Sequence, residues 1–126
     1  MKKNRVLIGS RTKKDEYVEN LSWSFPGGAL KSLDFSEEVE KFVKKETGFK
    51  VKTNQLVATR THPDSGFKNI QIVALYFHCK LIGGQENLNN DFTKVKWVKP
   101  LDVFKYFTTS TCDDVTKFLT MLEKSL

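Results

Sequence analysis

Cysteine is scarce in this 126-residue chain, which contains only Cys79 and Cys112. The two residues form no C-x-x-C pair, so no disulfide framework is indicated. With no secretory segment at the start of the chain, two such thiols are typical of reduced residues inside the cell. We interpret Cys79 as a small core residue within a strand, because no general base accompanies it.

Long apolar runs are also missing. The charged start, residues 1–5, is followed by only three apolar residues, Val6-Leu7-Ile8. Three residues are too few for the apolar region of a signal peptide. No run approaches the length of a membrane span. The chain shows no internal repeat, low-complexity tract or linker either, so we expect one soluble cytoplasmic domain over residues 1–126, with no membrane partner.

What the chain has in excess is positive charge, with 21 lysines and arginines against 15 aspartates and glutamates. A net charge of +6 favours anionic partners such as nucleotides, phosphates or RNA. The same excess also fits an ordinary solvated exterior, so it identifies no partner. Aromatic residues make up 12% of the chain, enough apolar mass for a core without disulfides or metals.

Two segments carry the signals of helices. Asp34 lies three residues before Glu37 and predicts an N-terminal capping box, and Gly48 predicts the helix end. A second capping box, Ser110 with Asp113, opens an amphipathic helix toward the C-terminus. Its apolar stripe comprises Val115, Phe118, Leu119 and Leu122.

The remaining apolar segments predict strands over Val6–Ile8, Trp23–Phe25, Val51–Arg60, Ile70–Leu81 and Phe92–Val98. Ile70–Leu81 is apolar on both faces, which predicts a strand sandwiched between layers. We therefore expect a mixed sheet with helices on both faces.

The stretch Trp23-Ser24-Phe25-Pro26-Gly27-Gly28, followed by a helix ending in Lys45-Glu46-Thr47-Gly48-Phe49, resembles the Nudix box. That pattern reads G-x5-E-x7-R-E-U-x-E-E-x-G-U and often follows FPGG. Residues 4–11, 61–66 and 95–101 also resemble segments of the family, in family order, so the resemblance covers nearly the whole chain. It implies an α+β fold, the Nudix-type α/β/α sandwich.

The resemblance also implies a departure at the N-terminus, where the family's first strand is shortened or missing. An open sheet edge of this kind motivates a hypothesis of homodimerisation.

The box itself is degenerate by this comparison. Counted back from Gly48, Lys41 stands at the family's arginine, Phe42 and Lys45 replace two glutamates, and Glu46 alone remains of the three. In the family such glutamates hold Mg²⁺ (or Mn²⁺), which bridges the substrate phosphates and activates water. Swapping a carboxylate for an ammonium should weaken metal binding strongly.

Residual metal binding would rest on Glu46 as ligand and catalytic residue, with further carboxylates from Asp34, Glu86 or Asp91. Asp34 falls at the upstream glutamate of the box when counted from Gly28, but the connector is one residue shorter than the pattern.

The resemblance implies substrate-binding roles for Gly27 and Gly28 as the phosphate-approach loop, Arg11 as a phosphate contact, Trp23 as a base-stacking residue, and Lys41 and Lys45 as phosphate contacts in place of metal. Each has a structural alternative. Trp23 also fits packing beneath the glycine turn, and Phe42 fits the apolar stripe of its helix. The lysines also fit surface pairs, Glu37 with Lys41 and Glu40 with Lys44.

Three functions remain open on the sequence. The first is a hydrolase of nucleoside diphosphates linked to another group, with impaired activity. The second is an inactive regulatory module that binds a nucleotide or RNA. The third is a scaffold without a small-molecule ligand. Specificity depends on loops outside the box, so the substrate itself is not predicted.

Overall fold

The computed structural model describes residues 5–11, 22–30, 32–62, 72–89, 91–108 and 113–125. Its elements, in order, are β1 (Val6–Arg11), β2 (Trp23–Ser24), α1 (Phe35–Thr47), β3 (Phe49–His62), β4 (Ile72–Gly84), β5 (Phe92–Val98), the 3₁₀ helix η1 (Pro100–Lys105) and α2 (Asp113–Lys124). Ser110, Cys112 and the expected turn at 63–66 lie outside the described residues, as do residues 1–4. The predicted strand over Phe92–Val98 is confirmed with the same bounds.

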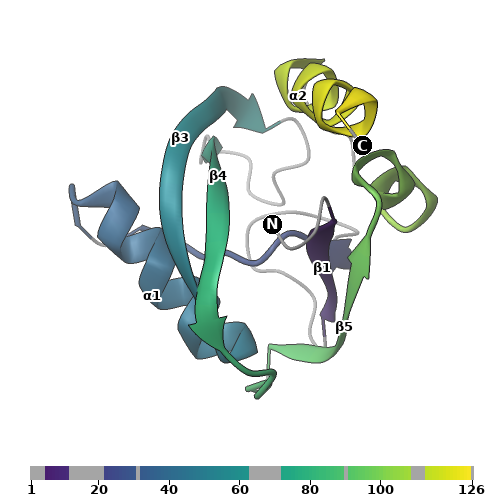
Figure 1. Ribbon diagram of the computed structural model, residues 1–126. Helices are drawn as coiled ribbons and strands as arrows, with labels where there is room; N and C mark the ends of the chain where they lie inside the picture. The colour runs from purple at the N-terminus through teal and green to yellow at the C-terminus, as the bar shows by residue number, and fades with distance from the viewer. Residues whose placement is uncertain are drawn as a thin grey trace.

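The described strands form two antiparallel sheets, one in the order β2-β1-β5 and the other a long β3–β4 ribbon. In Figure 1 the ribbon lies between α1 on one side and β1, β5 and α2 on the other. The expected α+β fold with helices on both faces is therefore confirmed. No helix in the described ranges is long and apolar enough to cross a membrane.

Local signals account for the bounds of α1. The Asp34 side chain accepts a hydrogen bond from the Glu37 amide at 3.2 Å, which satisfies one free N–H of the first turn. At the other end Gly48 adopts a left-handed conformation, with φ of 84°, and its N–H donates to the Lys44 carbonyl. Glycine is favoured there because a side chain would clash in this conformation.

A second glycine, Gly84, ends β4 with φ of 78° and lies directly against Gly48. A Cβ on Gly84 would strike the Gly48 carbonyl oxygen, and one on Gly48 would strike the Gln85 carbonyl oxygen. The Asn87 amide then donates to the Thr47 carbonyl at 2.8 Å. The loop that follows β4 is thereby fixed against the C-terminal end of α1.

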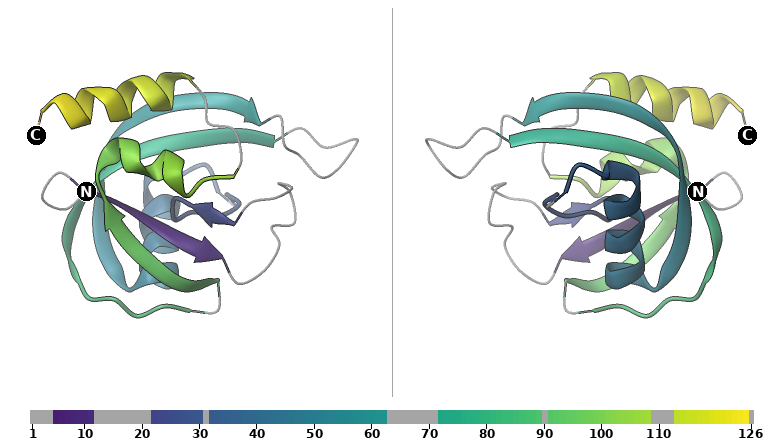
Figure 2. Two further views of the ribbon diagram at one scale, coloured as in Figure 1. Left: turned by 90° about the vertical axis from the view of Figure 1, so that its right-hand side faces the viewer. Right: turned by 90° about the vertical axis from the view of Figure 1, so that its left-hand side faces the viewer.

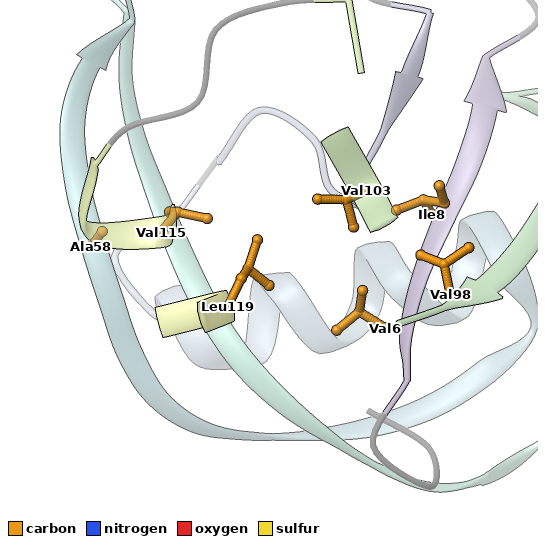
Figure 3. Close-up of a cluster of buried hydrophobic side chains, with 7 residues drawn as sticks. All are labelled: Val6, Ile8, Ala58, Val98, Val103, Val115 and Leu119. Carbon is orange, nitrogen blue, oxygen red and sulfur yellow. The ribbon is translucent and has the colours of Figure 1, made fainter. Parts of the chain in front are cut away.

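The main core lies between the three-stranded sheet, η1 and α2. Figure 3 shows Leu119 of α2 between two groups of side chains. One group comes from β1, β5 and η1, and the other consists of Ala58 of β3 and Val115 of α2. Ile8 and Val103 are fully buried at 0% exposure. The full cluster comprises Val6, Ile8, Ala58, Val98, Val103, Val115 and Leu119.

The β3–β4 ribbon differs from its prediction. None of the residues from Val73 to Gly84 is buried, and Val73 and Ile82 are 64% and 60% exposed. The strand expected between two layers is therefore only partly covered, because residues 74–79 are half-buried whereas Val73 and Ile82, near its two ends, are exposed. The reason is that an apolar pattern on both faces does not determine which faces find a partner, and this ribbon extends beyond the helices that flank it (Figure 2).

Candidate active site

Glu46, in the last turn of α1, joins three parts of the chain that are distant in sequence. Glu46 is only 4% exposed to solvent. One carboxylate oxygen, Oε1, accepts a hydrogen bond from the Gly27 backbone N–H at 2.8 Å. The other, Oε2, accepts from Arg11 Nη1 at 3.3 Å in an ion pair. The glycine loop, the end of β1 and the helix are thus connected through one buried carboxylate.

Arg11 is held by the three-stranded sheet. Its Nε donates to Ser24 Oγ at 2.9 Å, and its guanidinium carbon lies 4.9 Å from the centre of the Phe92 ring. The Phe92 ring fills the space above Gly9, where a Cβ would come within 2.6 Å of it. The side chain of Arg11 is consequently only 14% exposed. A cation that is both stacked and hydrogen-bonded is oriented before any ligand arrives.

Burial is the main influence on the Glu46 carboxyl group and raises its pKa above the ordinary value of 4.5. The Gly27 N–H and the Arg11 guanidinium act in the opposite direction and lower the pKa. Asp91 is close enough to raise it further by charge repulsion. The Asn89 side chain accepts from the Asp91 N–H at 2.8 Å and donates to its carboxylate at 3.1 Å. Asp91 is therefore the second carboxylate of this region.

Phe42 lies one helical turn before Glu46 and on the same face of α1. Its ring is packed against Gly28, where an added Cβ would come within 3.2 Å of the ring. The glycine loop therefore rests on a phenyl ring and on a buried carboxylate.

The four carboxylates proposed from the sequence do not come together as one metal site. Asp34 caps α1 at the opposite end from Glu46, and at 1.5 Å of rise per residue the two lie roughly 18 Å apart along the helix. Glu86 is exposed in the loop after β4. Within the described ranges, no three His, Cys, Asp or Glu side chains converge as metal ligands.

The described residues therefore fit a dedicated Mg²⁺ cage poorly. Glu46 already accepts a hydrogen bond at each oxygen, and one of its donors is a cation. Asp91 is the one further carboxylate in the described ranges whose charge raises the pKa of Glu46.

The three other predicted binding residues lie away from this carboxylate. Lys41 forms an exposed ion pair with Glu37 at 3.0 Å, as expected from their spacing. It lines a surface groove of α1 together with Lys45. Trp23 packs on Tyr106, the residue that follows η1, with ring centres 5.0 Å apart, and Lys94 lies over the indole ring. The indole thus packs at the end of η1, with a neighbour other than the expected glycine turn.

The expected pair of Glu40 with Lys44 is replaced by other contacts. Glu40 accepts from the Thr53 N–H at 2.9 Å and from its hydroxyl at 3.0 Å. Lys44 donates to the Gly48 carbonyl at 3.1 Å. Glu40 and Lys44 thus each form a hydrogen bond with a backbone group where α1 meets β3. The i,i+4 spacing alone does not predict these contacts.

Ser24 and Phe92 are part of the site but were not identified from the sequence. Both support Arg11 through tertiary contacts across the sheet, so no local pattern marks them. The one available signal is strand pairing, because β1 lies between β2 and β5.

No family model matches the chain. A MutT-like protein of Streptomyces ambofaciens is 37% identical over 88 residues, which cover 68% of this chain and 53% of that protein. The nucleoside triphosphatase NudI of Escherichia coli is 25% identical over 93 residues, covering 67% of this chain and 66% of that protein.

Solved structures agree with these relatives. A UDP-X diphosphatase matches with a TM-score of 0.69 at 19% identity, over 99% of this chain and 59% of that one. An ADP-ribose pyrophosphatase from Streptococcus suis matches with a TM-score of 0.67 at 19% identity, over 96% of this chain and 84% of that one. A MutT protein from Methanosarcina mazei also matches, with a TM-score of 0.67 at 16% identity over 98% and 86%.

Sequence and fold together support the Nudix family for this chain. It spans about half the length of the Streptomyces relative and two thirds of the Escherichia coli one. Seen as a Nudix protein, its Gly27-Gly28 turn and the Glu46 position of the box lie in contact, and Phe42 packs beneath the turn.

Proposed function

We propose that this chain is a Nudix pyrophosphate hydrolase that acts on nucleoside diphosphates linked to another group, and that its turnover is impaired. The observation that carries the proposal is the Glu46 carboxylate, which holds the Gly27 N–H at 2.8 Å and the Arg11 guanidinium at 3.3 Å. This contact keeps the glycine loop in the position that a phosphate must approach. One of the relatives is a nucleoside triphosphatase, which supports hydrolysis of a phosphate anhydride as the reaction class.

The impairment rests on what surrounds Glu46. Phe42 and Lys45 stand where the family pattern has glutamates, and the Phe42 ring packs on Gly28. When bound, Mg²⁺ or Mn²⁺ would polarise the phosphates and supply an activated water. Mg²⁺ often needs only one or two protein carboxylates when phosphates provide other ligands, and Glu46 and Asp91 are the residues that would supply them.

The chain's own contribution is binding and orientation. Arg11 lies stacked on Phe92 and tied to Ser24, so its guanidinium presents a fixed positive charge beside the glycine loop. A fixed cation of this kind favours the phosphate groups of a substrate and loses little entropy on binding.

The test is hydrolysis of a mixed substrate panel with Mg²⁺ and with Mn²⁺. The panel contains dNTPs, ADP-ribose, nucleotide sugars, dinucleoside polyphosphates and capped RNA. The wild-type chain should show slow, metal-dependent turnover of at least one substrate, and Glu46→Gln should abolish it. Glu37→Gln, which removes an exposed carboxylate from the same helix, is the matched control and should retain the activity. Absence of turnover in the wild type on every substrate would reject a hydrolase.

The alternative is a nucleotide- or RNA-binding module without turnover. The ion pair of Arg11 with the remaining box glutamate favours it, because a guanidinium already provides part of the charge that a metal would bring. A binder of this kind should hold its ligand equally well in EDTA and in Mg²⁺, and should lose affinity as salt rises. A hydrolase should bind its substrate more tightly with metal present.

A further inference from the structure

A groove of about 380 Å³ runs along α1 where the helix meets the start of β3 and the end of β4. Its walls are mostly charged and its floor includes two apolar side chains. The residues that line it are Glu37, Glu40, Lys41, Lys44, Lys45, Lys50, Val51 and Ile82. A volume of this size is at the lower end of the range for small-molecule sites.

The two acidic residues of the groove are already engaged by the protein. Glu37 pairs with Lys41 at 3.0 Å. Glu40 accepts both the N–H and the hydroxyl of Thr53, at 2.9 and 3.0 Å. Four lysines against two glutamates leave the lining of the groove with an excess of positive charge.

Lys44, Lys45 and Lys50 also line the groove, and in the described part of the chain none of them forms an ion pair with its two glutamates. Lys44 donates to the Gly48 carbonyl at 3.1 Å, which places its ammonium group at the end of the helix. Lys45 and Lys50 are both exposed, and neither makes a salt bridge to another residue within the described ranges. Three lysine side chains thus line one small space, and two of them have no carboxylate partner among the described residues.

The floor of the groove is apolar. Ile82 is 60% exposed although it is a large aliphatic side chain, and Val51 lies next to it in the groove lining. An exposed aliphatic surface surrounded by lysines fits a ligand that has a multiply charged anionic end and a less polar body. Neither floor residue is aromatic, and single-stranded nucleic acid usually needs aromatic rings on which bases stack. A small molecule is therefore favoured over RNA at this place.

Most of the groove faces away from the glycine loop. Successive residues of an α-helix are turned by about 100°, so Glu37, Lys41 and Lys44 lie roughly 100 to 180° around α1 from Phe42 and Glu46. Lys45 stands at the boundary, since it is turned by roughly 60° from Phe42 and about 100° from Glu46. The right-hand view of Figure 2 shows α1 in front of β1, the strand that carries Arg11. Phe42 and Glu46 contact the glycine loop, whereas the groove faces β3 and β4.

We infer that this groove is a second anion site, which binds a small organic diphosphate without a metal ion. The diphosphate lies among Lys44, Lys45 and Lys50, and the organic part lies on Val51 and Ile82. The site goes beyond the proposed hydrolysis, since within the described ranges none of its residues forms a hydrogen bond or ion pair with the glycine loop.

The test is calorimetric titration of the full chain in EDTA with two probes, ADP and inorganic diphosphate. The double variant Lys45→Gln/Lys50→Gln should weaken binding of both probes at least tenfold. Lys117→Gln/Lys124→Gln, which removes two exposed lysines of α2, is the control for net charge and should change binding less than twofold. Ile82→Ser should weaken binding of ADP several-fold and leave inorganic diphosphate unchanged, which separates the organic part from the phosphate part.

The outcomes also separate this site from the proposed hydrolase. Glu46→Gln should retain the metal-free binding of both probes even if it abolishes turnover. The inference is overturned if the wild type binds neither probe at millimolar concentration. It is equally overturned if the α2 control weakens binding as much as the groove variant does, or if Glu46→Gln removes the binding. If the chain binds the probes in EDTA but hydrolyses no substrate, the proposed hydrolase is rejected and the groove remains supported as a binding site.

Discussion

The ring of Phe42 lies against Gly28, so closely that a methyl group on this glycine would come within 3.2 Å of the ring. An aromatic side chain therefore occupies the place beneath the glycine loop where the Nudix pattern has a carboxylate. The loop keeps its form because Glu46 holds Gly27 and Phe42 supports Gly28. The same residue thus supports the loop and stands where the resemblance to the family implies a glutamate.

Restoring the missing carboxylates should increase turnover. The double variant Phe42→Glu/Lys45→Glu is expected to raise the metal-dependent hydrolysis rate at least tenfold, because it restores glutamates at the two positions where the Nudix pattern has them. Lys41→Glu places a new carboxylate where the pattern has an arginine, and should not raise the rate. Initial rates at saturating Mg²⁺ provide the measurement. Equal rates for the double variant and the wild type would mean that the replaced glutamates do not limit the reaction.

Removing the Glu46 side chain should destabilise the fold. Glu46→Ala leaves the nearly buried Arg11 guanidinium and the Gly27 N–H without their acceptor, a loss of about 3–5 kcal/mol for a broken buried ion pair. Glu46→Gln keeps an acceptor oxygen and should lose less. Glu37→Gln breaks a solvent-exposed pair and should cost much less than Glu46→Ala. Urea unfolding of the three variants measures the free energy of unfolding, and the loss should be largest for Glu46→Ala and smallest for Glu37→Gln. Equal losses for these two variants would contradict the prediction.

The stability difference between the wild type and Glu46→Gln should depend on pH. The pKa of Glu46 is raised in the fold because burial disfavours the charged form. Below the unfolded value of 4.5 the carboxyl group is protonated in both states, and its stabilising contribution is fully present. That contribution is lost as the pH rises through the folded pKa. Thermal unfolding from pH 4 upward should therefore show the wild type losing stability relative to Glu46→Gln, whereas a gain would mean that the Arg11 pairing outweighs burial.

Gly9 should not tolerate a side chain. A Cβ at this position would lie 2.6 Å from the Phe92 ring, which is 2% exposed and has no free space to move into. Gly9→Ala is expected to cost about 1–3 kcal/mol, as overpacking does in other cores, and to displace the ring on which Arg11 lies. Gly83→Ala is the control, because nothing lies within 4 Å of its Cβ position. Chemical denaturation of both variants would measure the difference.

Cys79 should react slowly with thiol reagents. Burial raises the pKa of its thiol to about 11, so little thiolate exists near pH 8. In a Cys112→Ser background, where Cys79 is the one remaining thiol, modification by a disulfide reagent should be at least tenfold slower in the folded chain than in urea. Equal rates in the two conditions would contradict the burial of this residue.

Local signals allowed parts of the fold to be predicted with accuracy. Asp34 and Gly48 mark the ends of α1 because an N-terminal cap and a left-handed C-terminal glycine act on their own helix. Pro100 marks the end of β5 for a similar reason, since proline cannot continue the strand pairing. Burial of β4 was not predictable in this way, because it depends on which faces the rest of the chain covers.

The candidate site shows the same division. Arg11, Gly27 and Glu46 were all identified from the sequence, but their mutual contact, between residues up to 35 positions apart, was not. Lys41 and Lys45 were grouped with the glycine loop because they belong to the same motif. In the structure both line the groove beside β3. Motif membership therefore did not predict on which side of the helix each residue lies.

The contact between Gly48 and Gly84 has a consequence for how this sequence can vary. Each glycine faces a backbone carbonyl oxygen, and a rotamer change in a neighbouring side chain cannot move that oxygen aside. A substitution at one position therefore cannot be compensated by a change at the other, although the two residues touch. In a library that varies both positions at once, functional clones should therefore retain both glycines. Residues in contact often vary together, but these two positions should show no correlated substitutions.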